Sequence, residues 1–319
     1  MGVALKKLDI GMHIFAQDVP TLIDRIIEAE GVGIQTAWMT SGGPAPDPLA
    51  VFSAVARETK EINFGTSIVP TFPRHPIALA QGASVVDQLA PGRLKLGIGP
   101  SHKPAMEMTY RFEFVRPLQH LREYLIILNA LLKDGKVNFH GDRLHAEAEL
   151  PGGPTGIKVM ASALRANAFR LCGEIADGGI SWVAPLPYLK SVALPALVDG
   201  AKTASREKPA LIAHVPVVVC EDPEEVWNAA SGQFGFYPRL PFYSSMWQDA
   251  GFPEAADGEF SRAMCEALVI QGNENEVAEK IESLPSYGVD EMLASVVILN
   301  DHGKTAQATI ELLGSLSKL

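Results

Sequence analysis

The chain has 319 residues, of which 47% are hydrophobic and 20% charged, and its formal net charge is −10 at pH 7. This negative balance argues against nucleic acid as the main partner, because such binding depends on clustered Lys and Arg. No apolar run approaches the roughly 18 residues of a membrane-spanning helix, so no membrane partner is expected.

Three widely spaced cysteines, Cys172, Cys220 and Cys265, form no disulfide framework and are typical of a reducing compartment. Asp9 interrupts the apolar N-terminal stretch, and no small-residue cleavage site follows it, so the N-terminus does not resemble a secretion signal. We therefore expect a cytoplasmic protein.

Short apolar segments alternate with longer amphipathic ones about eight times, a pattern typical of βα units and a parallel sheet. The expected strands are Leu8–Ile14, Thr36–Met39, Ile62–Ser67, Leu94–Ile98, Ile157–Ala161, Gly179–Trp182, Ile212–Cys220 and Met292–Ile298. The expected helices are Pro20–Glu30, Pro48–Thr59, Pro76–Leu89, Pro117–Lys133, Ala163–Ile175, Pro187–Ala204, one from Pro223 onward and one near Thr305–Leu316. This order predicts an α/β fold, a (β/α)8 TIM barrel with insertions, as one domain over residues 1–319.

Two stretches break the alternation. Residues 138–154 have short apolar pairs between glycine and charged residues, and we interpret them as an excursion before the fifth strand. Residues 232–261 are rich in Phe, Tyr, Trp and Pro and are too long for an ordinary connection. We interpret this second insertion as a lid or an oligomer contact.

Reacting groups of such a barrel follow the C-terminal ends of its strands. After the third strand, residues 65–76 form a proline-rich loop in which Thr66 and Ser67 have hydroxyls that can donate hydrogen bonds. An ordinary proline-rich turn explains this loop equally well. After the second strand, the small and polar residues 39–48 form either a passage for substrate or only a loop.

The loop after the fourth strand, residues 96–104, lacks the third glycine of a dinucleotide fingerprint. Gly99 allows a ligand to approach the backbone closely, and Ser101 and His102 would lie at the barrel mouth. A histidine there can exchange a proton near neutral pH, although an isolated histidine is more often structural or solvated.

After the fifth strand, Ser162 is a candidate cap for the next helix, whose first N–H groups and Arg165 would form an anion site for a phosphate. A capped helix with an exposed arginine is an equally good interpretation. After the sixth strand, Ser181 and Trp182 would face the mouth, where an indole can pack on a planar ring, although core packing is its default role. His120 and Glu123 lie on one helix without a second ligand pair, so no metal site is expected.

Three stretches resemble a known family: GTSIVPTFPRHPIALAQGASVVDQLAPGRLKLGIGPSHKP, REYLIILNALLKDGKVNFHGD and RLCGEIADG. The chain is similar over residues 8–182 to the luciferase-like oxidoreductases (the bacterial luciferase superfamily), particularly their F420-dependent branch. The resemblance implies coenzyme F420 as the cofactor, with FMN as the alternative, a small-molecule substrate and a homodimer.

The resemblance also implies roles for single residues. Ser67–Ile68 would be a bulge, often a cis peptide in relatives, that backs the central ring of the cofactor. Ser101 and His102 would lie near the reactive ring carbon, with His102 as a proton donor. The phosphate loop would be formed by Ala163, Leu164, Arg165 and Ala166, in which Arg165 replaces a glycine. Ser41–Gly42 stand where many relatives carry Asp-His, so histidine-assisted oxidation of a sugar phosphate is not expected.

These implications favour an F420-dependent oxidoreductase that transfers a hydride between the deazaflavin and a small organic substrate. The cofactor performs the difficult chemistry, and the barrel supplies position and orientation. The alternatives are an FMN-dependent monooxygenase on the same barrel and a non-catalytic protein that binds a flavin or deazaflavin.

Overall fold

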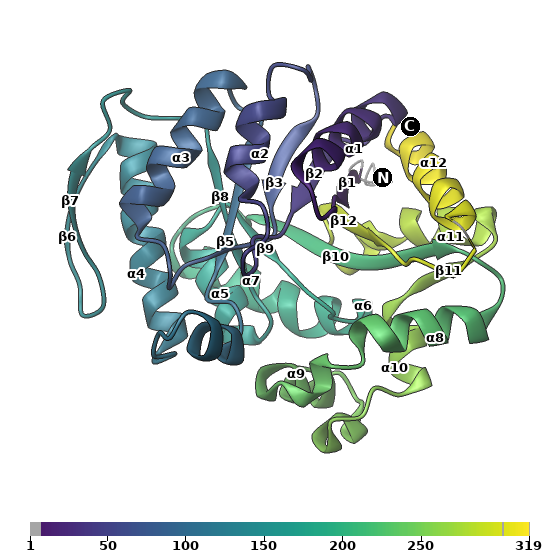
Figure 1. The fold of residues 1–319 in the computed structure, drawn as a ribbon. Coiled ribbons are helices and arrows are strands. Elements are labelled where there is room, and N and C mark those ends of the chain that lie inside the picture. Colours follow the sequence, from purple (N-terminus) through teal and green to yellow (C-terminus); the bar gives the residue numbers. More distant parts are fainter. Residues whose placement is uncertain (1–7, 302, 319) are drawn as a thin grey trace, which may run out of the picture.

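A closed ring of parallel strands forms the centre of the computed structural model, which describes residues 8–301 and 303–318 (Figure 1). The strands of the ring are β1 (Asp9–His13), β2 (Thr36–Met39), β3 (Asn63–Thr66), β5 (Leu94–Gly99), β8 (Lys158–Ser162), β9 (Gly178–Ile180), β10 (Ala210–Val219) and β12 (Glu291–Val296). β10 closes the ring because it pairs with both β9 and β12. Each strand coincides with a predicted one to within two residues at either end, so the predicted barrel is confirmed. Residues 1–7, which bear on the prediction that no secretion signal is present, lie outside the described residues.

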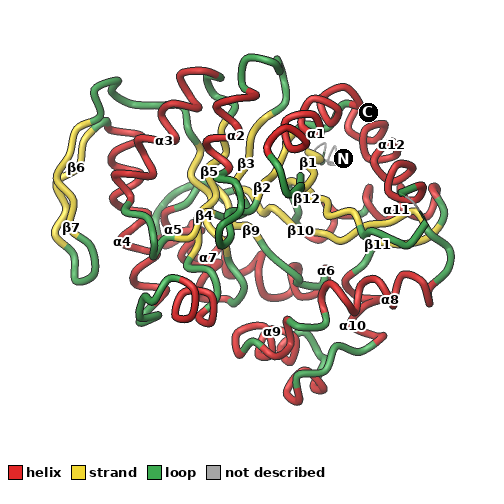
Figure 2. The backbone as a smooth tube through the Cα atoms, in the orientation of Figure 1, coloured by secondary structure: helices red, strands yellow, loops and turns green. Residues whose placement is uncertain are grey.

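Helices connect the strands and lie mostly outside the ring (Figure 2). They are α1 (Val19–Val32), α2 (Pro48–Val55), α3 (Pro76–Leu89), α4 (Pro117–Asn129), α5 (Ala166–Ile175), α6 (Leu186–Tyr188), α7 (Leu194–Thr203), α8 (Pro223–Phe234), α11 (Glu274–Glu282) and α12 (Lys304–Lys318). Proline lies in the first turn of most of them, where its missing N–H costs nothing. None of the described helices combines the length and hydrophobicity that crossing a bilayer requires.

The two predicted insertions have different structures. Residues 138–154 belong to an antiparallel hairpin of β6 (Lys136–His140) and β7 (His145–Glu149), which lies beside α4 at the edge of the molecule (Figure 1). The carboxylate of Glu123 on α4 holds the hairpin turn, because its Oε2 accepts hydrogen bonds from the N–H groups of Arg143 and Leu144 at 2.8 and 2.9 Å.

The second insertion, residues 232–261, is largely helical. It contains a 3-10 turn (Tyr237–Arg239), α9 (Pro241–Asp249) and a second 3-10 turn (Pro253–Asp257), and α10 (Arg262–Leu268) follows it. These short helices, α11, and the short strands β4 (Val69–Pro70) and β11 (Ile270–Gly272) were not predicted from the sequence. β4 pairs with β5 and β11 pairs with β10, and each is too short to show a period.

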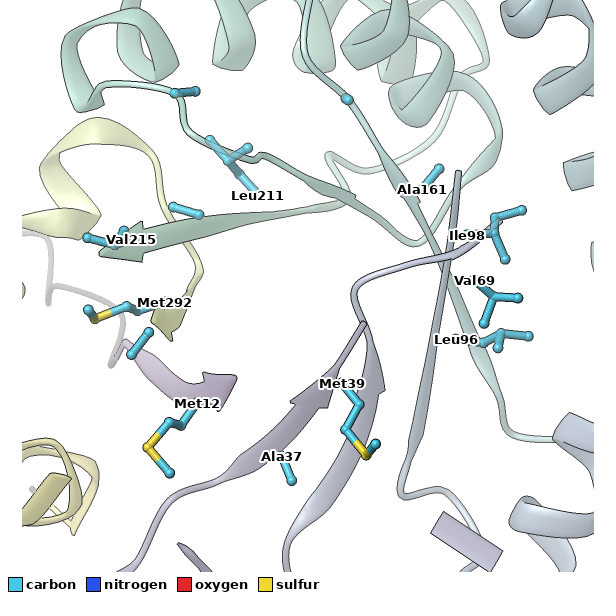
Figure 3. Close-up of a cluster of buried hydrophobic side chains, with 14 of the residues drawn as sticks. Met12, Ala37, Met39, Val69, Leu96, Ile98, Ala161, Leu211, Val215 and Met292 are labelled. Atoms are coloured by element: carbon cyan, nitrogen blue, oxygen red, sulfur yellow. The ribbon is translucent and has the colours of Figure 1, made fainter. Parts of the chain in front are cut away.

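Alternate residues of the barrel strands build two cores. One set packs between the strands and the helices, and Figure 3 shows members of it, among them Met12 of β1 and Ala37 and Met39 of β2. The other set forms a separate cluster of Trp38, Met160, Ile180, Ile212 and Leu293, which alternates with the first along the strands and therefore fills the inside of the ring.

Trp38 is the largest side chain of this inner cluster, and it is fully buried. The indole fits because the neighbouring strands carry glycine where a larger residue would overlap it. A Cβ on Gly11 would lie 2.4 Å from the indole Nε1, and a Cβ on Gly65 would lie 2.3 Å from the indole ring. The indole Nε1 donates to Glu291 at 3.1 Å, and Glu291 pairs with Lys95 at 2.6 Å. The inner cluster therefore includes a buried ion pair whose carboxylate also accepts the indole N–H.

We predict that Gly65→Ala destabilises the fold by about 1–3 kcal/mol, because the added methyl overlaps the Trp38 ring in a packed interior. Urea unfolding followed by fluorescence measures the change. The matched control is Gly232→Ala on α8, where a Cβ meets nothing within 4 Å and alanine favours the helix by about 0.5–1 kcal/mol. Equal stability of Gly65→Ala and the unmodified chain would contradict this account of the inner cluster.

Candidate active site

A cavity of about 770 Å³ lies at the C-terminal ends of the barrel strands. Ten of the eleven residues predicted to bind the cofactor line it: Ser67, Ile68, Ser101, His102, Ala163, Leu164, Arg165, Ala166, Ser181 and Trp182. They come from the loops after four different strands, β3, β5, β8 and β9, and closure of the ring brings these loops together. The exception is Gly99, the last residue of β5, which lies behind the wall: a Cβ there would lie 2.1 Å from Ser162 Oγ.

The floor of the cavity is held by hydrogen bonds between neighbouring strand ends. Thr40 Oγ1 donates to the carbonyl of Ser67 at 2.8 Å, and the Ser41 N–H donates to the carbonyl of Ile68 at 3.2 Å. The Ser67–Ile68 peptide is cis, as the family resemblance implies. Thr66, considered as a ligand donor from the sequence, instead bonds the backbone of Gly97 through its hydroxyl at 2.7 and 2.8 Å.

The predicted phosphate loop lines the cavity, but its predicted cap is wrong. Ser162 does not cap α5: β8 continues through Ser162, the chain then stays extended, and the helix begins at Ala166 with Arg165 as the capping residue and no side-chain cap. The guanidinium of Arg165 pairs with Asp249 of α9 at 2.8 Å, and both side chains are about 44% exposed. An anion at the N-terminus of α5 would therefore lie near an Arg165 side chain that already forms an ion pair with Asp249 of the second insertion.

His102 lies among tyrosine rings of the second insertion. Its ring centre is 5.6 Å from that of Tyr243 and 6.1 Å from that of Tyr237, and the two tyrosine rings are 4.8 Å apart. Burial lowers the pKa of His102 below its ordinary value of 6.5, so the imidazole is neutral at pH 7. Burial raises the pKa of both tyrosines, so their hydroxyls stay protonated and can donate hydrogen bonds.

Trp182 does face the cavity, but the planar ring against which it packs belongs to the protein. Its indole stacks on His214 of β10 with ring centres 3.6 Å apart. Ser181 is a residue of the cavity wall, and its buried Oγ has no hydrogen-bond partner among the described residues. Such an orphaned hydroxyl is what a polar ligand group would satisfy.

A second histidine, His13 of β1, lies next to the floor. Its Nε2 is 3.1 Å from Thr40 Oγ1, and desolvation lowers its pKa to about 4. The pKa of His214 is also well below 6.5, because the ring is buried and His13 is near. Both rings are therefore neutral at pH 7.

A large part of the wall was not predicted from the sequence. The unpredicted residues are Ala105, Phe114, Pro117, Leu118, Leu121, Asn167, Ala168, Ile180, Tyr237, Phe242, Tyr243 and Asp249. The aromatic richness of residues 232–261 signalled the importance of the second insertion but not which side chains face inward. No pattern in residues 105–118 marked them as part of the site. The predicted passage after β2 does reach the cavity, through Ser41 and Gly42.

The two residues considered and rejected as metal ligands have other contacts. His120 stacks on Phe72 with ring centres 4.2 Å apart, and Glu123 accepts the backbone N–H groups of the hairpin turn.

Known proteins resemble this chain in sequence and in fold. The family model described as luciferase-like monooxygenase matches residues 7–291. A relative, the F420-dependent glucose-6-phosphate dehydrogenase of Segniliparus rotundus, is 27% identical over 268 residues, which are 80% of this chain and 79% of the relative.

Two solved structures share the fold. The coenzyme F420-dependent tetrahydromethanopterin reductase of Methanopyrus kandleri has a TM-score of 0.77 at 22% identity and covers 97% of both chains. The oxygenating constituent of 3,6-diketocamphane monooxygenase from Pseudomonas putida, in complex with FMN, has a TM-score of 0.74 at 18% identity and covers 98% of both chains.

We predict that the free energy of unfolding falls as the pH drops from about 6.5 toward 4. Over this range His13 is protonated in the unfolded chain but stays neutral in the folded chain, where burial lowers its pKa to about 4. His13→Gln keeps a hydrogen-bonding group beside Thr40 and should reduce this loss by roughly 2 kcal/mol. Urea midpoints at pH 7 and pH 5 measure the effect. His140→Gln, on the exposed hairpin, is the control. A pH dependence unchanged by His13→Gln would contradict the burial of a neutral ring.

Proposed function

Since this chain belongs to the luciferase-like monooxygenase family, we propose that it is an oxidoreductase that binds coenzyme F420 and transfers a hydride between the deazaflavin and a small organic substrate. The observation that carries the proposal is the single cavity onto which Ser67, His102 and the loop of Ala163 all open. The F420-dependent relative matches most of this chain and supports the choice of cofactor.

The residues present fit such a cofactor. The volume, about 770 Å³, lies within the usual range of small-molecule sites. The Ser67–Ile68 bulge supplies a backing surface for a planar ring, and Ser181 Oγ supplies an unpartnered polar atom. Arg165 and the first N–H groups of α5 supply an anion site for a phosphate.

When bound, the deazaflavin accepts or supplies a hydride at one ring carbon. The protein's own part is to orient the substrate, exclude water and exchange a proton. We assign the proton to His102, which lies on the cavity wall. Because its pKa is lowered, the neutral imidazole accepts a proton during oxidation and donates one only after it is protonated. The hydroxyls of Tyr237 and Tyr243 can hold the substrate oxygen or nitrogen by hydrogen bonds.

A second candidate is an FMN-dependent monooxygenase, favoured by the shared fold of the FMN-bound Pseudomonas putida enzyme. Titration of the purified protein with F420 and with FMN separates the two, because the deazaflavin has a single long-wavelength absorbance band and the flavin has two. Tighter binding of FMN than of F420 would overturn our choice. A non-catalytic binding protein is favoured by two results together. The protein would bind F420 tightly without reducing any hydride acceptor, and His102→Ala would change only the affinity for F420.

We predict that Arg165→Gln weakens binding of F420 about tenfold, because one charged hydrogen-bond donor to the phosphate is lost at a half-exposed site. Binding of the same deazaflavin without its phosphate should not change. Fluorescence titration measures both affinities. Arg170→Gln is the matched control, since Arg170 lies on α5 but pairs with Asp199 at 2.8 Å and does not line the cavity. Equal losses for the two ligands would contradict the phosphate assignment.

We further predict that kcat for substrate reduction rises as the pH falls below about 6.5, because the protonated fraction of His102 grows toward its lowered pKa. The rate of the reverse oxidation should fall only where the pH comes close to this lowered pKa, because the neutral imidazole predominates above it. His102→Gln should lower both rates and flatten both pH profiles, which a merely structural role would not do. A steep profile that persists in His102→Gln would place the proton on another group.

A further inference from the structure

The cavity wall carries almost no charge. Among its lining residues the charged side chains are Arg165 and Asp249, and these two pair with each other at 2.8 Å. Arg165 is also the residue that we assign to the phosphate of the cofactor. Among the described residues of the wall, no cation is therefore free for a phosphate or carboxylate group of a substrate.

Part of the cavity wall is apolar. Phe114, Leu118 and Leu121 line it from α4 and the segment before this helix. Phe114 and Leu121 are buried, and Phe114 stacks on Phe72 with ring centres 5.2 Å apart, which fixes this wall in place. Tyr237, Phe242 and Tyr243 of the second insertion add aromatic rings to the same cavity.

Large apolar side chains are also exposed on the same two segments. We define the apolar collar as Met108, Phe112, Val115, Leu118, Phe236 and Phe242, whose exposed fractions run from 37% at Leu118 to 71% at Met108. Leu118 and Phe242 belong to both the collar and the cavity wall, so these two apolar side chains are both solvent-accessible and part of the cavity. Clustered exposed apolar residues at a pocket mark a binding site.

We infer that the substrate is an uncharged and largely apolar organic molecule, which enters across the apolar collar and whose apolar body contacts Leu118, Leu121 and Phe242. The reaction assigned to this substrate depends on the proposed function, but the preference for apolar over anionic molecules comes from the wall alone. One polar group of the substrate is accommodated, because His102, Tyr237 and Tyr243 provide hydrogen-bonding groups in the same cavity. A phosphorylated sugar, the substrate in the name of the Segniliparus rotundus relative, does not fit this wall.

The test measures binding before turnover. A homologous series of alkan-2-ones of increasing chain length is titrated calorimetrically into the full chain loaded with F420, and glucose-6-phosphate is titrated as the anionic probe. Each added methylene should tighten binding up to about fourfold, with a negative heat-capacity change. Glucose-6-phosphate should bind more weakly than the longer ketones. Affinity that does not depend on chain length, or a preference for glucose-6-phosphate, would overturn the inference.

Two variants test whether the gain in affinity per methylene comes from Leu118 and Phe242. Leu118→Asp and Phe242→Ser should reduce the gain in affinity per methylene while leaving the affinity for F420 within about twofold. Val85→Asp is the matched control, because Val85 is 50% exposed on α3 and lies outside the collar and the cavity. Leu118 is the second residue of α4, a position where aspartate favours a helix, so this variant is expected to fold.

Two further outcomes separate this inference from the proposed function. If F420 does not bind, the proposed function fails, and the same ketone titrations into the chain without cofactor still decide the substrate preference. If Leu118→Asp changes the sedimentation or elution of the protein but not the affinity for ketones, the collar is a contact between two copies of the chain and the inference is wrong.

Discussion

The candidate site depends on the closure of the barrel. β10 pairs with β12 along Ile212–Val217 and with β9 at Ala210–Ile212. Because β12 also pairs with β1, these contacts join the first, middle and last parts of the chain in one ring. In a closed parallel ring every strand delivers its C-terminal end to the same mouth. Residues as distant in sequence as Ser67 and Tyr243 therefore share one cavity. An open sheet of the same strands would spread these loops along an edge.

Most of the barrel could be predicted from sequence because its signal is local. Most strands are short apolar runs followed by a helix that begins with proline or a capping aspartate, such as Asp47 before Pro48. The loops at the mouth were predictable for the same reason, since they directly follow these strands. Ser162 was misassigned because strand β8 runs on to the residue that looked like a helix cap, and residue preferences alone do not fix where a strand stops.

The other half of the site could not be predicted because its contacts are not local. Tyr237 and Tyr243 reach His102 across more than a hundred residues of sequence, and only tertiary packing places them there. Leu118 and Leu121 look like ordinary members of an amphipathic helix. The two halves differ in chemistry: the barrel loops carry most of the small polar groups, whereas the segments outside the ring carry most of the aromatic rings. We expect the first half to serve the cofactor and the second to serve the substrate.

The fit of Trp38 between Gly11 and Gly65 has an evolutionary consequence. A smaller residue at position 38 would leave a void in the ring, and any side chain at either glycine would collide with the indole. The three positions therefore cannot drift independently. Descendants of this sequence should either keep all three residues or exchange them together, for instance an aliphatic residue at 38 accompanied by alanine on a neighbouring strand. Covariation among these strands would thus record how each lineage fills the centre of its barrel.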